Sequence, residues 1–185
     1  MLRLFVAVEI PSDLQSALAY IQNEAKKELK GARWVPPKNI HLTLKFLGSC
    51  PEEQLLSIES ALSKAVERRT PFTFRLNRLG GFPSDKRARV FWIGVGEGSE
   101  ELSKLSGRLE KFLEPLGFER EKRKFHSHTT LARFKVPQNL QGVISRIDMT
   151  ELIVPIRVEM IALIQSQLTP KGAVYTPIKY FPLKG

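Results

Sequence analysis

The residues best suited to chemistry are two His-x-Thr triplets, His41-Leu-Thr43 and His128-Thr-Thr130, which hold two of the three histidines of the chain. In an extended strand alternate side chains share a face, so each triplet presents an imidazole beside a hydroxyl. An imidazole can donate or accept a proton near neutral pH, and a hydroxyl can donate a hydrogen bond to an anionic oxygen. Two such triplets facing one another would hold a phosphate between two proton carriers.

The triplets belong to a longer internal repeat. His41-Leu-Thr-Leu-Lys-Phe46 aligns with His128-Thr-Thr-Leu-Ala-Arg133 at an offset of 87 residues (128 − 41). Upstream, Arg3-Leu-Phe-Val-Ala-Val8 matches Arg89-Val-Phe-Trp-Ile-Gly-Val95, and a helix-like stretch separates strand from triplet in each half. A lone His-x-Thr is more often an ordinary pair of strand residues, but the repeat favours two functional triplets in one cleft.

Hydrophobic spacing and turn residues predict the elements that must position these triplets. Strands are expected at 2–9, at each triplet, and at 72–79, 89–95, 150–166 and 173–181. Helices are expected at 13–29, 52–68 and 99–116, with a short one within 137–147. Paired prolines predict an irregular loop at 33–39, and glycines predict a turn at 80–85. The pattern favours an α+β fold in which residues 1–185 form one domain of two similar lobes sharing a cleft.

Composition narrows the partners and the compartment. Lys and Arg outnumber Asp and Glu by 29 to 19, giving a formal charge of +10, which attracts polyanions. Two of the basic clusters, at 120–124 and 133–135, flank the second triplet, although such runs are often only solvated faces. The single cysteine, Cys50, excludes an internal disulfide, and no apolar stretch is long enough to span a membrane. A cytoplasmic protein is expected.

Several longer strings carry a family resemblance. They are Arg33-Trp-Val-Pro-Pro-Lys-Asn-Ile-His-Leu-Thr-Leu-Lys-Phe-Leu-Gly48, Leu79-Gly-Gly-Phe-Pro83, Phe125-His-Ser-His-Thr-Thr-Leu-Ala-Arg133 and Tyr175-Thr-Pro177. The chain thereby resembles the two-histidine (2H) phosphoesterase superfamily, in its RNA 2′,3′-cyclic phosphodiesterase branch, also called 2′-5′ RNA ligases. The resemblance implies a bilobal, pseudo-two-fold fold of duplicated β-α-β units, with two antiparallel sheets lining a central cleft and helices outside. Ser127 and Thr129 depart from the family's usual proline and aliphatic residue, for which we expect altered packing but retained activity.

The resemblance also implies roles for the residues. His128 would activate water and His41 would protonate the leaving O3′, giving a 2′-phosphomonoester. The reverse reaction would be a weak 2′-5′ RNA ligation. Thr43 and Thr130 would bind the non-bridging phosphate oxygens, although a lone strand threonine is more often structural. Arg133 would contact the phosphate, and Phe46 would stack on the nucleobase.

Strand parity bears on four further expectations. Phe46 and Arg133 lie five residues after their histidines, so a bulge or strand end after each threonine is needed to turn them toward the cleft. Lys45 shares the parity of His41, and would either add positive field or be solvated at the strand end. His126 shares the parity of His128 and could contact the nucleotide. The pair could also bind a metal ion, but no carboxylate or cysteine stands beside it, so neither metal nor cofactor is expected.

The expected partner is therefore RNA that ends in a 2′,3′-cyclic phosphate, tRNA halves being one example, bound by a monomer and not by a membrane protein. Two alternatives stay open. One is a non-catalytic RNA-binding module, for which the basic charge would suffice. The other is a related enzyme that acts on a small cyclic nucleotide or on ADP-ribose cyclic phosphate.

Overall fold

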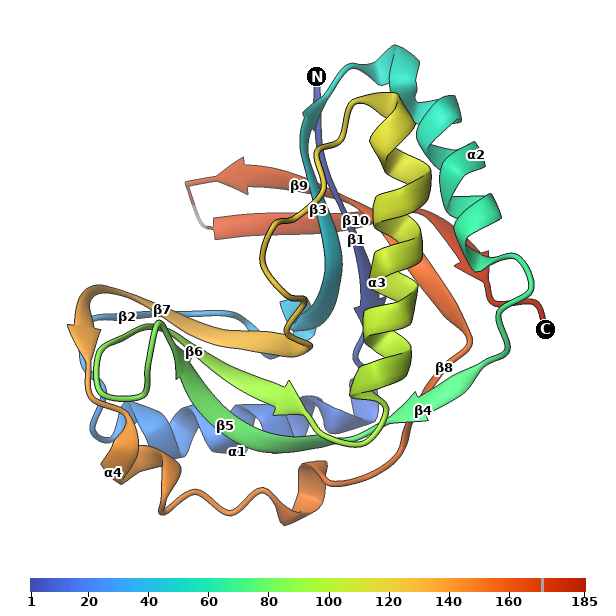
Figure 1. Cartoon of the computed structure of the whole chain (residues 1–185). Coiled ribbons are helices and arrows are strands. Elements are labelled where there is room, and N and C mark those ends of the chain that lie inside the picture. Colours follow the sequence, from blue (N-terminus) through green and yellow to red (C-terminus); the bar gives the residue numbers. More distant parts are fainter. Residues whose placement is uncertain (171) are drawn as a thin grey trace.

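The computed structural model describes residues 1–170 and 172–185 and contains one large antiparallel sheet (Figure 1). The strands of this sheet run in the order β10-β9-β1-β3-β7-β6-β5, and β2 pairs with β7. Their bounds are β1 Leu2–Glu9, β2 Ala32–Trp34, β3 His41–Cys50, β5 Leu76–Phe82, β6 Ala88–Val95, β7 His128–Gln138, β9 Met160–Thr169 and β10 Gly172–Pro182. Strands β4 (Phe72–Phe74) and β8 (Ile156–Val158) form a second, small sheet.

The large sheet consists of two halves that meet at the two triplet strands. Strands β10, β9, β1 and β3 make one half, and β2, β7, β6 and β5 make the other. Leu42 of β3 lies opposite Thr129 of β7, and this register pair joins the halves. The expected bilobal α+β fold is confirmed, but the two sheets that were expected are the two halves of one continuous sheet, which meet edge to edge where the triplet strands pair.

The helices are exchanged between the halves. Helices α2 (Leu55–Val66) and α3 (Ser99–Leu113) lie side by side against the half that contains β1 and β3, whereas α1 (Gln15–Lys26) lies against the half that contains β5, β6 and β7 (Figure 1). Thus α1 follows β1 in the chain but covers the other half, and α3 follows β6 and also covers the other half. The main hydrophobic core lies between the sheet and these helices. The fourth helix, α4 (Gln141–Ile144), is a single short turn.

Several element boundaries differ from the sequence prediction. The strand expected at 72–79 divides into β4 and β5 at Arg75, because Arg75 bonds to residues 96 and 97 and the two parts pair with different strands. The strand expected at 150–166 likewise divides into β8 and β9. The loop expected at 33–39 includes β2, which pairs with β7, and a 3-10 turn at Pro37–Asn39.

The glycine pair expected to form a turn lies inside β5 instead. Gly80 and Gly81 are paired with Trp92 and Phe91 of β6. A Cβ built on Gly80 would lie 2.4 Å from the Trp92 ring, so glycine is needed there for close approach of that ring and not for chain reversal. Among the described residues, no helix is long and apolar enough to cross a membrane.

Candidate active site

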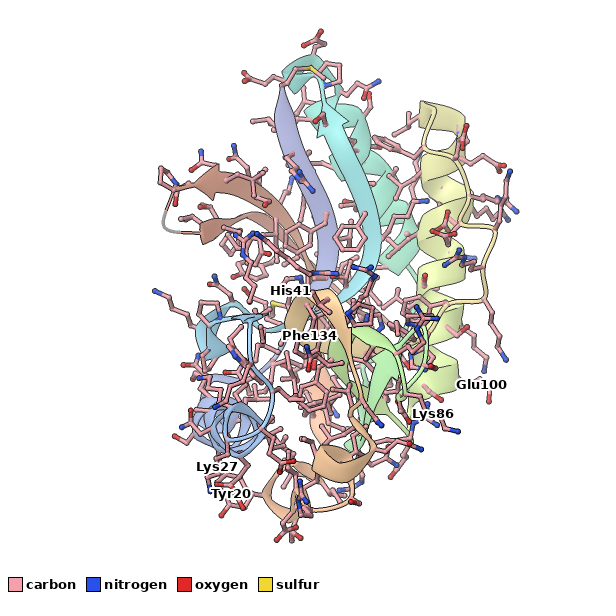
Figure 2. All side chains as sticks on the ribbon, turned by 90° about the vertical axis from the view of Figure 1, so that its left-hand side faces the viewer. Tyr20, Lys27, His41, Lys86, Glu100 and Phe134 are labelled. Carbon is pink, nitrogen blue, oxygen red and sulfur yellow. The ribbon has the colours of Figure 1, made fainter. Side chains whose placement is uncertain are left out.

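The pairing of β3 with β7 gathers both triplets on one face of the sheet. Leu42 and Thr129 point into the core, and the two strands are antiparallel at this pair. The flanking positions therefore place His41 beside Thr130 and Thr43 beside His128, with Cβ separations of about 4.5–5.5 Å expected for such pairs. All four side chains are half-buried on the opposite face. Figure 2 places His41 where the two halves meet. The site is a block of two imidazoles and two hydroxyls, each imidazole beside the hydroxyl of the other triplet.

Both imidazoles are oriented by the same backbone contact. Nδ1 of His41 lies 2.8 Å from the carbonyl oxygen of Asn39, and Nδ1 of His128 lies 2.7 Å from that of His126. A carbonyl oxygen only accepts, so Nδ1 of each ring carries the proton and donates it. In the neutral state each Nε2 is then left with a lone pair. Each histidine can take up or release a proton at Nε2 while its ring stays fixed.

The surroundings of the two rings differ. His41 stacks on Phe5 of β1, with ring centroids 4.6 Å apart and planes at 29°, and meets the edge of Tyr175 at 5.1 Å. His128 packs edge-on against Phe82 of β5 at 5.0 Å. An aromatic ring thereby packs against each imidazole: Phe5 comes from the strand adjacent to β3, and Phe82 comes from β5, two strands away from β7.

Burial lowers the pKa of both histidines. For His41, desolvation lowers the pKa and the hydrogen bond to the Asn39 carbonyl partly opposes it. For His128, desolvation is again the largest cause, and the positive charges of His126 and Arg133 lower the pKa further. The fields around the two imidazoles are therefore unequal, because His128 alone has cationic neighbours among these causes.

The predicted departure from a regular pleat is confirmed in both strands. In the pairing of β1 with β3, Val6 lies opposite Lys45 and Ala7 opposite Thr43, so Leu44 is a bulged residue. In the pairing of β6 with β7, Phe91 lies opposite Ala132 and Trp92 opposite Thr130, so Leu131 is a bulged residue. The two bulges immediately follow Thr43 and Thr130 and are 87 positions apart (131 − 44).

The bulges bring the residues that follow them onto the face of the triplets. Phe46 is 67 % exposed, and its ring centroid lies 6.1 Å from that of Phe5, on which His41 stacks. Arg133 is also exposed and close enough to His128 to lower the pKa of that imidazole. The structure thus brings Phe46 and Arg133 together with the triplets on the cleft side.

The same bulge removes Lys45 from the cleft. Both expectations for Lys45, a positive field in the site and a solvated strand end, are wrong. Its side chain is 8 % exposed on the helix side of the sheet, where Nζ lies 2.7 Å from Glu110 Oε2 of α3 and 2.6 Å from the Glu119 carbonyl oxygen. Lys45 therefore ties α3 and the segment before His128 to β3.

His126 lies on the same side as His128. Its ring centroid is 5.6 Å from that of His128 and 4.8 Å from that of Trp92, and Arg78 Nη2 lies 3.4 Å from its Nε2. Desolvation and then the charge of Arg78 lower its pKa. In the described part of the chain, no group of three His, Cys, Asp or Glu side chains is arranged to hold a metal ion.

A pocket of about 500 Å³ opens beside His41 toward β9 and β10. Its lining includes Lys38, Tyr175 and Tyr180, together with carboxylates at Glu9 and Glu159. The charges of this wall are mixed, whereas the other side of the site carries Arg78 and Arg133.

Sequence reasoning missed the two aromatic rings beside the histidines and one arginine. Phe5 lies in the apolar run Leu4–Val8 of β1, whose residues are buried on both faces of the sheet. Leu4 and Val6 face the helices and Phe5 faces the other side, a difference that the sequence does not reveal. Phe82 was missed because the sequence predicted a turn at 80–85, whereas Phe82 is the last residue of β5. Nothing in the sequence around Arg78 singles it out.

These features define a class: a phosphoesterase with a duplicated antiparallel fold and one His-x-Thr triplet from each half. The family model described as LigT like Phosphoesterase matches the chain twice, at residues 8–92 and 93–175, so the chain belongs to this family. The repeat seen in the sequence corresponds to these two matches.

Individual relatives cover nearly the whole chain. An RNA 2′,3′-cyclic phosphodiesterase of Archaeoglobus fulgidus is 36 % identical over 97 % of this chain and 99 % of its own length. One from Aquifex aeolicus is 32 % identical over 99 % and 98 %. Among solved structures, one from Thermus thermophilus has a TM-score of 0.75 at 33 % identity, covering 99 % of this chain and 98 % of its own. The structure of E. coli LigT complexed with 3′-AMP has a TM-score of 0.77 at 26 % identity, covering 100 % and 99 %.

Proposed function

We propose that this chain hydrolyses RNA 2′,3′-cyclic phosphate ends to 2′-phosphomonoesters, with His41 and His128 as the proton-transfer pair and without a metal ion. The cyclic phosphodiesterase activity is that of the family and of its full-length relatives. The observation that carries the assignment of residues is the block of two imidazoles and two hydroxyls at the junction of β3 and β7.

The reaction needs a base, an acid and a site for the phosphoryl charge. Water attacks phosphorus, and Nε2 of His128 takes the proton that the water loses. The bond from phosphorus to O3′ breaks, and Nε2 of protonated His41 supplies the proton that O3′ requires. Thr43 and Thr130 donate hydrogen bonds to the non-bridging oxygens, and Arg133 adds a planar, bidentate donor set.

The division of roles is that of the family, and the charges around His128 are compatible with its role as the base. After desolvation, the charges of His126 and Arg133 lower the pKa of His128, which favours the neutral imidazole that a base requires. The causes that shift the pKa of His41 include no such cation. A ribose 5′-hydroxyl that attacks phosphorus in place of water loses its proton to His128 while O3′ takes one from His41, which gives a slow 2′-5′ ligation. The roles of the two histidines exchange when that linkage is cleaved back to the cyclic phosphate.

RNA is the substrate class that fits both the relatives and the formal charge of +10. We propose that Phe46 stacks on the terminal base and that His126 contacts the same nucleotide. The RNA ends would include those of tRNA halves. The enzyme would be a monomer, with residues 1–185 forming a single domain, and would act in the cytoplasm. The single buried Cys50 is compatible with a reducing compartment.

The test is hydrolysis of a short oligoribonucleotide that ends in a 2′,3′-cyclic phosphate, in buffer that contains a chelator. Chromatography against 2′- and 3′-phosphate standards identifies the product. His41→Ala and His128→Ala should each lower the rate by about 10²–10⁴-fold, the range of general acid or base catalysis. Thermal unfolding of both variants should match the parent chain, because both side chains lie on the cleft face.

Full activity in either histidine variant would refute the proposed pair. Activity that is lost in the chelator and restored by zinc would instead support a metal site at His126 and His128. A nucleoside 2′,3′-cyclic phosphate is assayed in parallel as the alternative substrate. If RNA is the substrate class, kcat/KM should be much higher on the oligonucleotide than on this small cyclic nucleotide.

A further inference from the structure

Two polar side chains in the helices reach the two bulges. Gln22 of α1 is 2 % exposed and donates from Nε2 to the carbonyl oxygen of Leu131, 3.1 Å away. Ser106 of α3 is 3 % exposed and donates from Oγ to the carbonyl oxygen of Leu44, 3.0 Å away. Leu131 and Leu44 are the bulged residues that follow Thr130 and Thr43.

Gln22 and Ser106 occupy equivalent positions in the repeat. Gln22 is the eighth residue of α1, which begins at Gln15, and Ser106 is the eighth residue of α3, which begins at Ser99. Because the two helices are exchanged, each side chain contacts the bulge of the other half of the chain. One donor is an amide and the other a hydroxyl, yet their acceptors are equivalent carbonyl groups.

The chemistry of a bulge explains why such a donor is needed. A bulge disrupts the ladder and leaves the extra residue unpaired by the neighbouring strand. A buried carbonyl without a hydrogen bond costs about 1–3 kcal/mol. The Ser106 hydroxyl supplies such a bond to the Leu44 carbonyl, whereas the Leu131 carbonyl also accepts one from the Val35 N–H at 2.9 Å, so Gln22 adds a second donor there. Both helix donors stabilise the bulged register relative to a regular pleat. In a regular pleat Phe46 and Arg133 would turn away from the cleft.

A purely structural explanation fits less well. The other buried residues of α1 are Ala17, Leu18, Ile21 and Ala25, and those of α3 are Leu102, Leu105, Leu109 and Leu113. Burying an amide or a hydroxyl in such a layer costs free energy that an apolar side chain would avoid. The polar residue occurs at the one helix position, in both repeats, that faces a bulge carbonyl.

We propose that Ser106 and Gln22 are positioning residues for catalysis: Ser106 holds the bulge that presents Phe46, and Gln22 holds the bulge that presents Arg133. Gln22 has a second contact, because its Nε2 also donates to the Val35 carbonyl oxygen at 2.6 Å. It therefore also ties the loop before His41 to the second triplet strand. This inference rests on the proposed roles of Phe46 and Arg133.

Double-mutant cycles test the inference. Ser106→Ala alone should raise KM about 5–10-fold, as expected for one lost hydrogen bond of about 1 kcal/mol. In the Phe46→Leu background it should change KM less than twofold, because its effect is transmitted through Phe46. Gln22→Met alone should lower kcat about 5–10-fold, and much less in the Arg133→Lys background. In the crossed pairs, the fold-changes of the two single variants should multiply. These pairs are Ser106→Ala with Arg133→Lys and Gln22→Met with Phe46→Leu.

Two further variants separate positioning from a general loss of packing. Ser106→Thr keeps the hydroxyl and should restore KM. Thr129→Val removes a buried hydroxyl from β7, 0 % exposed, that makes no hydrogen bond to the described residues, and it should leave kcat and KM unchanged. A structural role alone would predict equal effects in every background, with kinetics that follow the free energy of unfolding.

Multiplicative effects in both matched pairs would overturn the inference and leave the proposed function intact. If Phe46→Leu and Arg133→Lys themselves leave hydrolysis unchanged, the proposed site assignment fails, and the positioning role fails with it. The second case is recognised from the single variants alone, so the two failures are distinguishable.

Discussion

His41 lies face to face with Phe5, with ring centroids 4.6 Å apart. His128 has no such stack with Phe82, whose ring it meets edge-on at an interplanar angle of 87°. Both arrangements take an imidazole partly out of water, and desolvation is the largest cause of the lowered pKa of each histidine. The two histidines are therefore equivalent in the repeat but have different surroundings.

The lowered pKa values predict the pH dependence of hydrolysis. The productive free enzyme has one protonated and one neutral histidine, and both pKa values lie below the usual value of about 6.5. The singly protonated pair is then most populated below that pH. The profile of kcat/KM should be bell-shaped, with its optimum on the acid side of neutrality and a fall as the pH rises. The two limbs belong to the coupled pair.

Rates measured from pH 4.5 to 9 test this expectation. The kcat profile should lie at higher pH than that of kcat/KM, because bound phosphate stabilises an imidazolium. His126→Ala should shift at least one limb upward, since the charge of His126 contributes to the lowered pKa of His128. A rate that rises over the whole range would rule out an acid–base pair.

Arg133→Lys should weaken catalysis although the charge is kept. Guanidinium offers two parallel donors to a phosphate, whereas an ammonium group is a point charge. A charged hydrogen bond is worth about 1.5–3 kcal/mol, so kcat/KM should fall about 10–100-fold. Arg120→Lys, at an exposed residue paired with Glu114, is the matched control and should have no effect. Equal rates for both variants would remove Arg133 from the site.

Phe46→Leu should weaken nucleotide binding with little change in kcat. Stacking of a base on an aromatic ring is worth about 1–3 kcal/mol, which corresponds to an increase of about 5–150-fold in KM and in the Kd of a 2′-nucleotide. The side chain is exposed, so the unfolding temperature should stay the same. Leu56→Ala, at another exposed apolar residue on α2, is the control. An unchanged Kd would show that the base binds elsewhere, for example in the pocket beside His41.

The repeated strands could be predicted from local residues alone, and both bulges could be predicted once the family resemblance assigned ligand contacts to Phe46 and Arg133. Phe46 and Arg133 are equivalent residues with the wrong parity for a regular strand, and one irregularity in each strand resolves both. The same bulge turns the Lys45 side chain to the helix side of the sheet. Its burial there also depends on its ion pair with Glu110 of α3, which is distant in sequence.

The exchange of helices could not be predicted in this way. The apolar residues of α1 and α3 indicate which helix face is buried, but not which half of the sheet covers it. Gln22 could accordingly not be recognised, because its role appears only when α1 lies against β7. Gly80 is a second example. A glycine is required at this position, but the reason is the close approach of the Trp92 ring on the adjacent strand and not a turn.

Lys45→Met should destabilise the fold by about 3 kcal/mol, because it leaves the largely buried carboxylate of Glu110 without its cationic partner. Adding Glu110→Gln should recover part of this loss, since a neutral amide costs less to leave without a cation. Chemical unfolding of the single and double variants measures the difference. Losses of the two single variants that add up in the double variant would show that the two side chains are not coupled.

Thr129→Val should stabilise the protein. The Thr129 hydroxyl is fully buried, makes no hydrogen bond to the residues that the structure describes, and lies on the helix side of β7 opposite Leu42. Valine has nearly the same shape, so the substitution removes the cost of burying that hydroxyl, about 1–3 kcal/mol, without leaving a cavity. The free energy of unfolding should rise by about this amount while hydrolysis is unchanged. A lower stability would mean that an ordered water or another partner satisfies the hydroxyl, and Thr129→Ser, which keeps the hydroxyl and loses the methyl group, would then be the less damaging substitution.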